Sequence, residues 1–278
     1  MHISIIEGIM EVVEKTIEYV KTADEFRLYP LGDLHLGTKY CVEHDLQEVI
    51  TKIKNDPQAL WLGMGDYGEF IAPADKRWDY KAIADWLKDH QDNIAEIQTE
   101  YIQSLFESIA EKCIGLIEGN HEDYIRRFLH VDVQRNLCKR LSVPNLGYSA
   151  WVKLRFARQN SNEHHVYKCV FSHGSGWAMT PGAKVARLQR FMNAFDARVY
   201  GYGHVHDIIT HTVPYLALSE SNTIRQKERV GAMTGCWFRS YTQGVAASYA
   251  EKRNYPPTSL GCPTFVIRPT TDEVRVEG

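Results

Sequence analysis

Five short polar clusters in this chain carry the residue types that bind divalent metal ions. In chain order they are Asp33-Leu34-His35, Gly65-Asp66, Gly119-Asn120-His121-Glu122, His173 and Gly203-His204-Val205-His206. Carboxylate, imidazole and amide groups suit Mn, Fe, Zn or Mg, and none of the clusters contains a thiolate. Two such ions can clamp and polarise a phosphoryl group, so the clusters together predict a two-metal hydrolytic site.

Two of the clusters place candidate ligands two residues apart. In an extended segment, residues i and i+2 point to the same side of the backbone. We therefore expect Asp33 and His35 to converge on one ion, and we expect the same of His204 and His206.

A short apolar run precedes each cluster and is expected to form the strand that positions it. These runs are bounded by glycine and turn residues and cover residues 26–31, 59–64, 113–117, 167–171 and 197–200. Each cluster then follows the carboxyl end of a buried strand, which is where open α/β sheets bind ligands.

The spacing of apolar residues in the other segments predicts the remaining helices and strands of an α/β fold. Apolar spacing predicts helices over 43–54, over 76–110 with a break near 90–93, over 122–141 and over 182–195. Alternating segments predict a hairpin of 148–156 with 166–171, an edge strand near 15–20, and strands over 208–215, 228–233 and 264–268. We expect one domain over 1–278, built as a two-sheet sandwich flanked by helices. Residues 207–278 would complete the second sheet, with 251–263 as a loop that caps the site.

Taken in order, the five clusters resemble the motifs of the calcineurin-like metallophosphoesterase superfamily. Its pattern of D-x-H, G-D, G-N-H-[DE], H and G-H-x-H is met in full between Asp33 and His206. Any single cluster would more often be an ordinary loop with a structural histidine, whereas the ordered set is specific. The chain is also similar to small phage and bacterial phosphoesterases and, at Asp33-Leu34-His35-Leu36-Gly37, to the DNA-repair nuclease branch.

The resemblance implies a role for each matched residue. Two divalent ions are expected, Mn first, with Fe, Zn, Ni and Mg as alternatives. His121 would be a catalytic histidine beside the phosphate that binds no metal and supplies a proton or a positive charge near neutral pH. The implied ligands are Asp33, His35 and His206 for the first ion, Asp66 shared by both, and Asn120, His173 and His204 for the second.

Two acidic residues compete to support His121. The family often has G-D-x-x-D, and here Glu69 occupies the last position, one methylene longer than aspartate. Glu122 follows His121 directly and is the competing partner. An equally good explanation of Glu122 is an acid in the first turn of a helix, where the macrodipole favours it.

Residues around the clusters could contact a substrate. Arg126 and Arg127 follow His121 by one to two helical turns, which could bring one of them near a phosphate. Solvated arginines on a helix face are the alternative. Tyr67 and Trp177 follow candidate ligands closely and could stack on a base, with core packing as the alternative.

Composition limits the classes of protein that remain. The chain has 278 residues and a formal charge of -3, which excludes coating of nucleic acid by bulk electrostatics. Its six cysteines show no C-x-x-C spacing and are expected to be reduced core residues. Neither a signal peptide nor a membrane-spanning apolar run is visible. We expect a cytoplasmic protein, in the host cytoplasm if phage-encoded, with no membrane partner.

Three functions follow, in order of preference. The first is a phosphodiesterase that acts on nucleic acid, such as DNA, or on nucleotides; endonuclease and exonuclease action both remain open. The second is a phosphomonoesterase, weakened because Glu118 stands before Gly119 where that branch usually has arginine. The third is a scaffold in a nucleic-acid-processing complex, disfavoured as a sole role because every ligand and His121 are present. The oligomeric state is left open, a homodimer included.

Overall fold

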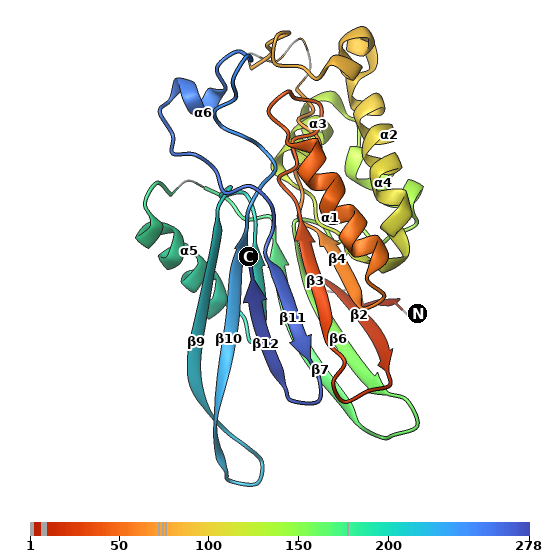
Figure 1. Ribbon diagram of the computed structural model, residues 1–278, viewed down its shortest axis with the longest axis vertical. Coiled ribbons are helices and arrows are strands. Elements are labelled where there is room, and N and C mark those ends of the chain that lie inside the picture. The colour runs from red at the N-terminus through yellow and green to blue at the C-terminus, as the bar shows by residue number, and fades with distance from the viewer. Residues whose placement is uncertain (1–2, 7–9, 72, 74, 76, 177) are drawn as a thin grey trace.

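Two β-sheets face each other in the computed structural model, and helices cover their outer faces (Figure 1). The structure describes residues 3–6, 10–71, 73, 75, 77–176 and 178–278. This arrangement confirms the expected α/β sandwich flanked by helices.

The smaller sheet has five strands in the order β12-β11-β3-β4-β5. The strands β3, β4 and β5 are parallel, and β11 joins β3 in the antiparallel sense. The bounds are β3 (Phe26–Leu31), β4 (Ala59–Gly63), β5 (Cys113–Leu116), β11 (Thr264–Arg268) and β12 (Glu273–Glu277).

The larger sheet has seven strands in the order β1-β2-β6-β7-β8-β10-β9. The pair β7 and β8 is parallel, and β9 with β10 forms a long hairpin that extends beyond the other strands (Figure 1). The bounds are β1 (Ile3–Ile6), β2 (Glu11–Tyr19), β6 (Ser149–Arg158), β7 (His164–Ser172), β8 (Val199–Tyr202), β9 (Ile208–Leu218) and β10 (Ile224–Thr234).

Most helices lie on the outer face of the smaller sheet, while α5 packs against β9 and β10 of the larger one (Figure 1). The α-helices are α1 (Glu43–Asn55), α2 (Ile94–Phe106), α3 (Asn120–Leu129), α4 (Val133–Leu141), α5 (Pro181–Asn193) and α6 (Tyr249–Lys252). Two 3-10 helices, η1 (Asp85–Asn93) and η2 (Glu107–Lys112), flank α2. Among the described residues, no helix combines the length and apolar character that crossing a membrane requires.

Two expected helices are divided. The segment 122–141 forms α3 and α4, because His130 adopts a left-handed φ of 56° and Asp132 accepts a hydrogen bond from the Arg135 amide, which starts a new helix. The segment 76–110 breaks near 90–93 as expected, but its first helix begins only at Asp85. Upstream, the carboxylates of Asp75 and Asp79 accept bonds from backbone amides two residues on, which favours turns over helix.

Other differences concern strand placement. The strand near 15–20 is β2, but it lies between β1 and β6 and is not an edge strand. β12 was not foreseen from the sequence. The C-terminal segment supplies strands to both sheets, since β9 and β10 join the larger one and β11 and β12 the smaller.

The main hydrophobic core lies between the two sheets, where residues of both inner faces meet, among them Phe26, Leu62, Val152, Phe156 and Phe265. A second core packs the helices against the outer face of the smaller sheet. All six cysteines are free, and four of them are buried, as expected for reduced core residues. Both sheets are therefore fixed on at least one face, which makes their strand ends rigid supports.

Candidate metal centre

The five cluster-bearing strands end at one edge of the sandwich. β3, β4 and β5 are parallel in the smaller sheet, and β7 and β8 are parallel in the larger one. The smaller sheet supplies Asp33, His35, Asp66 and Asn120, and the larger sheet supplies the remaining three histidines. Ligands predicted from segments far apart in the sequence thereby meet at the seam between the sheets.

Five of the seven candidate ligands have a left-handed rather than an extended backbone. φ is 50° at both Asp33 and His35, 52° at Asp66, 69° at His204 and 57° at His206. The expected extended backbone is therefore wrong. Asp33 and His35 still fall in one ligand group, whereas His204 and His206 fall in two different groups, which contradicts their expected convergence on one ion. A left-handed conformation in a residue with a side chain costs roughly 1–3 kcal/mol, and such strain concentrates at functional sites.

Hydrogen bonds between loops hold this strained backbone in place. The amides of Asp33 and Leu34 donate to the carbonyl oxygens of Gly65 and Asp66, each at 2.9 Å. The loop after β5 packs so closely on the loop after β4 that a Cβ on Gly119 would lie 2.2 Å from the Asp66 nitrogen. Glycine at 119 is therefore required by close approach of two loops, both of which carry candidate ligands.

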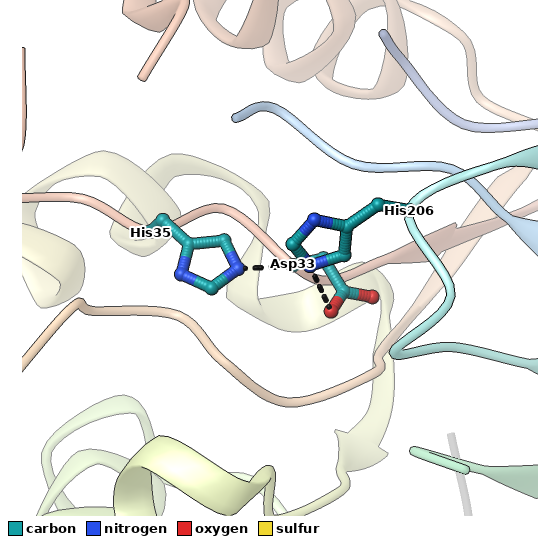
Figure 2. A group of neighbouring side chains, drawn as sticks. All are labelled: Asp33, His35 and His206. Carbon is teal, nitrogen blue, oxygen red and sulfur yellow. Dashed lines mark hydrogen bonds and ion pairs between the residues drawn. The ribbon is translucent and has the colours of Figure 1, made fainter. Parts of the chain in front are cut away.

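Asp33, His35 and His206 form the first group of candidate ligands (Figure 2). Nε2 of His35 lies 3.1 Å from Nε2 of His206, and Nε2 of His206 lies 3.2 Å from Oδ1 of Asp33. Asp33 Oδ2 accepts a bond from the His204 amide, whereas Asp33 Oδ1 is buried and accepts none within the described residues. A cation beside Oδ1 would satisfy that orphaned oxygen and separate two facing ring nitrogens, so this group fits a metal ion.

The second group comprises Asp66, His173 and His204. Nδ1 of His173 donates to the Met64 carbonyl oxygen at 2.7 Å, which leaves Nε2 as the ligand atom. That Nε2 lies 3.0 Å from Oδ1 of Asn120 and 3.4 Å from Oδ2 of Asp66. Nδ1 of His204 is buried without a hydrogen-bond partner in the described part of the chain. The donor set again matches a divalent cation.

Glu69 supports two histidines at once. Its carboxylate oxygen Oε2 lies 2.8 Å from Nδ1 of His35, and its backbone carbonyl oxygen lies 2.6 Å from Nδ1 of His121. These three residues also form a group with metal-binding spacing. Both contacts engage the Nδ1 atoms, so they orient the rings and leave each Nε2 directed away from Glu69. The longer side chain thus reaches His35, while the backbone orients His121.

Glu122 ties the loops together. It is buried, its Oε2 accepts bonds from the amides of Asp66 and Gly119, and its Oε1 accepts one from the Tyr67 amide. Burial, with the nearby charge of Asp66, raises the pKa of Glu122 to about 7. Its place in the first turn of α3 matches the helix-terminus alternative, because its oxygens face backbone amides.

The electrostatics of the centre favour ionised carboxylates. Burial alone would raise the pKa of Asp66, but the imidazoles of His173 and His121 hold it well below its usual value. Although burial disfavours the imidazolium, Asp66 and Glu69 raise the pKa of His121. Burial and the charge of His173 lower the pKa of His204 to about 4, which keeps His204 neutral. Ionised carboxylates and a neutral imidazole are the forms that bind metals. Although burial opposes it, Asp66 raises the pKa of His173 to about 10, so a metal at its Nε2 would displace a proton.

A cavity of about 460 Å³ opens above these residues. Its floor includes His35, Asp66, Asn120, His121 and the two histidines after β8. Part of the expected cap loop also lines it, at residues 253 and 255–258. Five of the seven implied ligands and His121 therefore face a space large enough for a small substrate, while Asp33 and His173 lie buried behind them.

Several predicted substrate contacts lie elsewhere. Tyr67 is fully buried and donates to the Ile117 carbonyl oxygen, which makes it a core residue. Arg126 and Arg127 are exposed and ion-paired with Asp123, and neither is among the described lining of the cavity. Trp177 lies outside the described residues.

Glu118 is the partner of Arg126, with Oε1 3.0 Å from the guanidinium Nε. The sequence interpretation assumed that this carboxylate would repel a terminal phosphate. Because an arginine neutralises the carboxylate, Glu118 gives no reason to prefer the phosphodiesterase function over the phosphomonoesterase function.

Among the lining residues that were not foreseen from the sequence are Arg77, Lys184 and Tyr249. Arg77 lies in a stretch of turns, Lys184 is on α5 and Tyr249 begins α6. None stands in a recognisable motif, because their nearness to the ligands arises from packing between distant loops.

No family model and no curated protein sequence matches this chain. Among solved structures, it is similar to Vps29 from Chaetomium thermophilum, at 12% sequence identity and a TM-score of 0.36. That likeness covers 92% of this chain and 94% of Vps29. A likeness this distant carries no information about activity or ligands, so the functional conclusion depends on the site itself.

Proposed function

We propose that this chain is a two-metal phosphodiesterase that acts on nucleic acid or nucleotides. The observation that carries the proposal is the pair of three-residue ligand groups, each with two members that line one cavity and each with a buried polar atom that lacks a hydrogen bond among the described residues. The resemblance of the five clusters to calcineurin-like metallophosphoesterases points to the same reaction class.

Each part of the site has a distinct task in the proposed reaction. Two bound divalent ions would polarise the phosphoryl oxygens and lower the pKa of a water molecule. The first ion would be held by Asp33, His35 and His206, and the second by Asp66, Asn120, His173 and His204. His121 keeps its Nε2 within 4.0 Å of Oδ2 of Asp66 and donates its Nδ1 proton to the Glu69 carbonyl. With its pKa raised, His121 can donate a proton to the leaving oxygen.

Charge in the cavity favours a diester over a monoester. Among the described residues, three cationic side chains line the cavity. Arg77 and Lys184 are each paired with a carboxylate, Asp75 and Asp207 respectively, while Arg253 donates to the Tyr255 hydroxyl. A monoester dianion needs more uncompensated positive charge than a diester monoanion does. The paired cations therefore support the phosphodiesterase as the first candidate.

Steady-state rates would test the proposal directly. The substrates are bis-p-nitrophenyl phosphate, p-nitrophenyl phosphate, single-stranded DNA and duplex DNA, each with added Mn²⁺, Zn²⁺, Fe²⁺, Ni²⁺ or Mg²⁺. We expect metal-dependent hydrolysis with the diester preferred and Mn²⁺ the best activator. A strong preference for the monoester would overturn the choice of substrate. If no ester is hydrolysed with any metal, the proposal that this chain is an enzyme would be overturned.

A further inference from the structure

A second compartment of about 280 Å³ adjoins the metal-site cavity. The two spaces share Glu69, Arg77 and Tyr249 in their walls. Its size is close to the lower end of small-molecule pockets, about 300 Å³. A molecule whose phosphate reaches the candidate ligands could therefore extend into this compartment across the shared wall.

The walls combine apolar surface with fixed polar groups. Trp78 packs against the buried side chains of Ile83 and Leu87, and all three line the compartment. Gln98 is 1% exposed, and its Oε1 accepts the Phe70 amide at 2.9 Å, which fixes the side-chain amide with Nε2 as its donor end. Such a mixture of aromatic and aliphatic walls with a few oriented polar groups is typical of small-molecule sites.

Arg77 forms the boundary between the two spaces. Its Nε and Nη2 lie 3.1 Å and 2.8 Å from the carboxylate oxygens of Asp75, and its guanidinium lies 5.1 Å from the centre of the Tyr124 ring. These contacts hold a long side chain in one place at low entropic cost. Arg77 is thereby positioned to contact a phosphate oxygen or the ester group beside it.

Tyr40 and Tyr249 define the opposite wall. The Tyr40 hydroxyl donates to the Ala246 carbonyl oxygen at 2.9 Å, and both tyrosine rings pack on Phe238. Phe238 also contacts the rings of His35 and His206. The wall of the compartment is thus linked through Phe238 to two candidate metal ligands.

We propose that this compartment binds the base-bearing group of a nucleotide whose phosphate is held at the metal centre. This inference rests on the proposed function and names the substrate class of the same site. A planar heteroaromatic ring matches walls of tryptophan and tyrosine, and the Gln98 amide and the hydroxyl of Thr38 can hydrogen-bond to its edge. A base inside a duplex is stacked and paired, so only a free nucleotide or a single strand can supply the ring.

Calorimetry on the Mn-loaded protein tests this without turnover. The probes are inorganic phosphate, ethyl phosphate and thymidine 5′-monophosphate. We expect the nucleotide to bind at least about tenfold more tightly than ethyl phosphate, since stacking of one base gives an effect of this order. Equal affinities of the nucleotide and ethyl phosphate would overturn the inference.

Matched variants locate the effect. Trp78→Ala should abolish the preference for the nucleotide over ethyl phosphate while leaving phosphate affinity unchanged. Trp86→Ala is the control, because Trp86 packs on the same apolar cluster but is not among the described lining residues. Ala82→Leu fills the compartment without removing core atoms and should have the same effect as Trp78→Ala, which covers the case in which that variant fails to fold. An unchanged preference in Ala82→Leu would overturn the inference.

Failure of the two proposals can be told apart. Nucleotide-selective binding without hydrolysis of any ester would overturn the proposed phosphodiesterase activity but would support base binding in the second compartment. Hydrolysis of diesters with equal rates on single-stranded and duplex DNA, and no preference for the nucleotide in calorimetry, would overturn the compartment alone. We expect hydrolysis of a dinucleotide and of single-stranded DNA at least about tenfold faster than that of duplex DNA, because the stacked base cannot enter.

Discussion

At the residue scale, the histidines of the site are oriented by contacts at one ring nitrogen. Nδ1 of His173 faces the Met64 carbonyl, Nδ1 of His35 faces the Glu69 carboxylate, and Nδ1 of His121 faces the Glu69 carbonyl. Each contact selects a tautomer and a ring orientation, so the opposite nitrogen is directed toward the other residues of the site. The histidines differ in the neighbour of Nε2. Nε2 of His35 lies beside Nε2 of His206 and Nε2 of His173 beside Oδ1 of Asn120, whereas Nε2 of His121 lies 4.0 Å from Oδ2 of Asp66.

Asp66→Asn should abolish metal-dependent turnover and leave a folded protein. The amide keeps the shape and can still accept the His121 backbone N–H at Oδ1, now 2.9 Å away, but it loses the negative charge. We expect a fall of more than a hundredfold in kcat with Mn²⁺, since even residues that only support ligands change metal affinity or activity by 10–100-fold. Asp45→Asn, on the exposed face of α1, is the control. Full activity of Asp66→Asn would show that Asp66 is not a metal ligand.

His121→Asn should separate catalysis from metal binding. The loss of a general acid lowers turnover by roughly 10²–10⁴-fold, whereas metal content per chain should stay within error of the wild type. Elemental analysis of the purified variant and its steady-state rate provide the two readings. Loss of metal in parallel with activity would place His121 among the ligands.

Glu122→Gln should weaken metal binding although Glu122 is not itself a candidate ligand. Its two oxygens accept three backbone amides, and the glutamine nitrogen cannot accept any. The loops that carry Asp66 and Asn120 should then lose their alignment, and metal affinity should fall about 10–100-fold in a titration. Glu118→Gln is the matched control, because Glu118 pairs with Arg126 instead. Equal affinities in the two variants would contradict this role.

At the scale of elements, the strand ends provide rigidity and the loops carry strain. Backbone hydrogen bonds between the loops after β3 and β4 keep Asp33 and Asp66 left-handed.

A buried lysine lies between the two sheets. Lys15 of β2 is 0% exposed and donates from Nζ to the Cys113 carbonyl oxygen on β5 at 2.9 Å. Desolvation lowers the pKa of Lys15 to about 8.

Lys15→Met should raise the free energy of unfolding at pH 7. At pH 7 the folded wild type bears a buried charge on Lys15. Removal of this charge raises the free energy of unfolding by roughly 3 kcal/mol, whereas loss of the hydrogen bond lowers it by about 1 kcal/mol. Because the unfolded pKa exceeds the folded one, the wild type recovers stability as pH rises from about 8 toward about 10.5. The advantage of Lys15→Met should therefore shrink over that window.

Denaturant unfolding at pH 7 and pH 10 would measure this change. Lys153→Met is the control, since Lys153 is exposed and pairs with Glu14 on the sheet surface. A difference between Lys15→Met and wild type that is the same at both pH values would contradict the buried charge.

At the scale of the whole molecule, the candidate centre joins two sheets. The first ligand group takes Asp33 and His35 from one sheet and His206 from the other, and the second group is divided in the same way. Bound ions would therefore link the two halves of the sandwich at its ligand-bearing edge. Metal affinity and fold stability should be coupled.

Removal of metal should lower the melting temperature. At a free Mn²⁺ concentration of 100 times Kd, one bound ion stabilises the fold by about 2.7 kcal/mol, which corresponds to roughly 5–10 °C for a chain of this size. Differential scanning calorimetry with Mn²⁺ and with EDTA would measure the shift. Asp66→Asn should show a clearly smaller shift. Identical melting temperatures with Mn²⁺ and EDTA in the wild type would contradict a metal centre between the sheets.

The sequence by itself determined the fold class and most strand positions and named the candidate ligands, but residue spacing wrongly placed His204 and His206 on one ion. Apolar runs and the polar residues that follow them are local patterns, so β3, β4, β5, β7 and β8 could be located without a structure. The helix break at His130 was missed because the capping role of Asp132 was overlooked, although that signal was present in the sequence. β12 is short and has a single buried residue, which leaves little pattern to read.

Only the tertiary structure decided which groups support the ligands. Glu69 contacts His35 through its side chain and His121 through its backbone, Arg126 neutralises Glu118, and Arg77 lies between two cavities. Each of these pairings depends on how loops from different strands pack, and chain spacing does not encode that packing. The left-handed ligands show the same limit, because hydrogen bonds between loops, rather than local preference, impose their conformation.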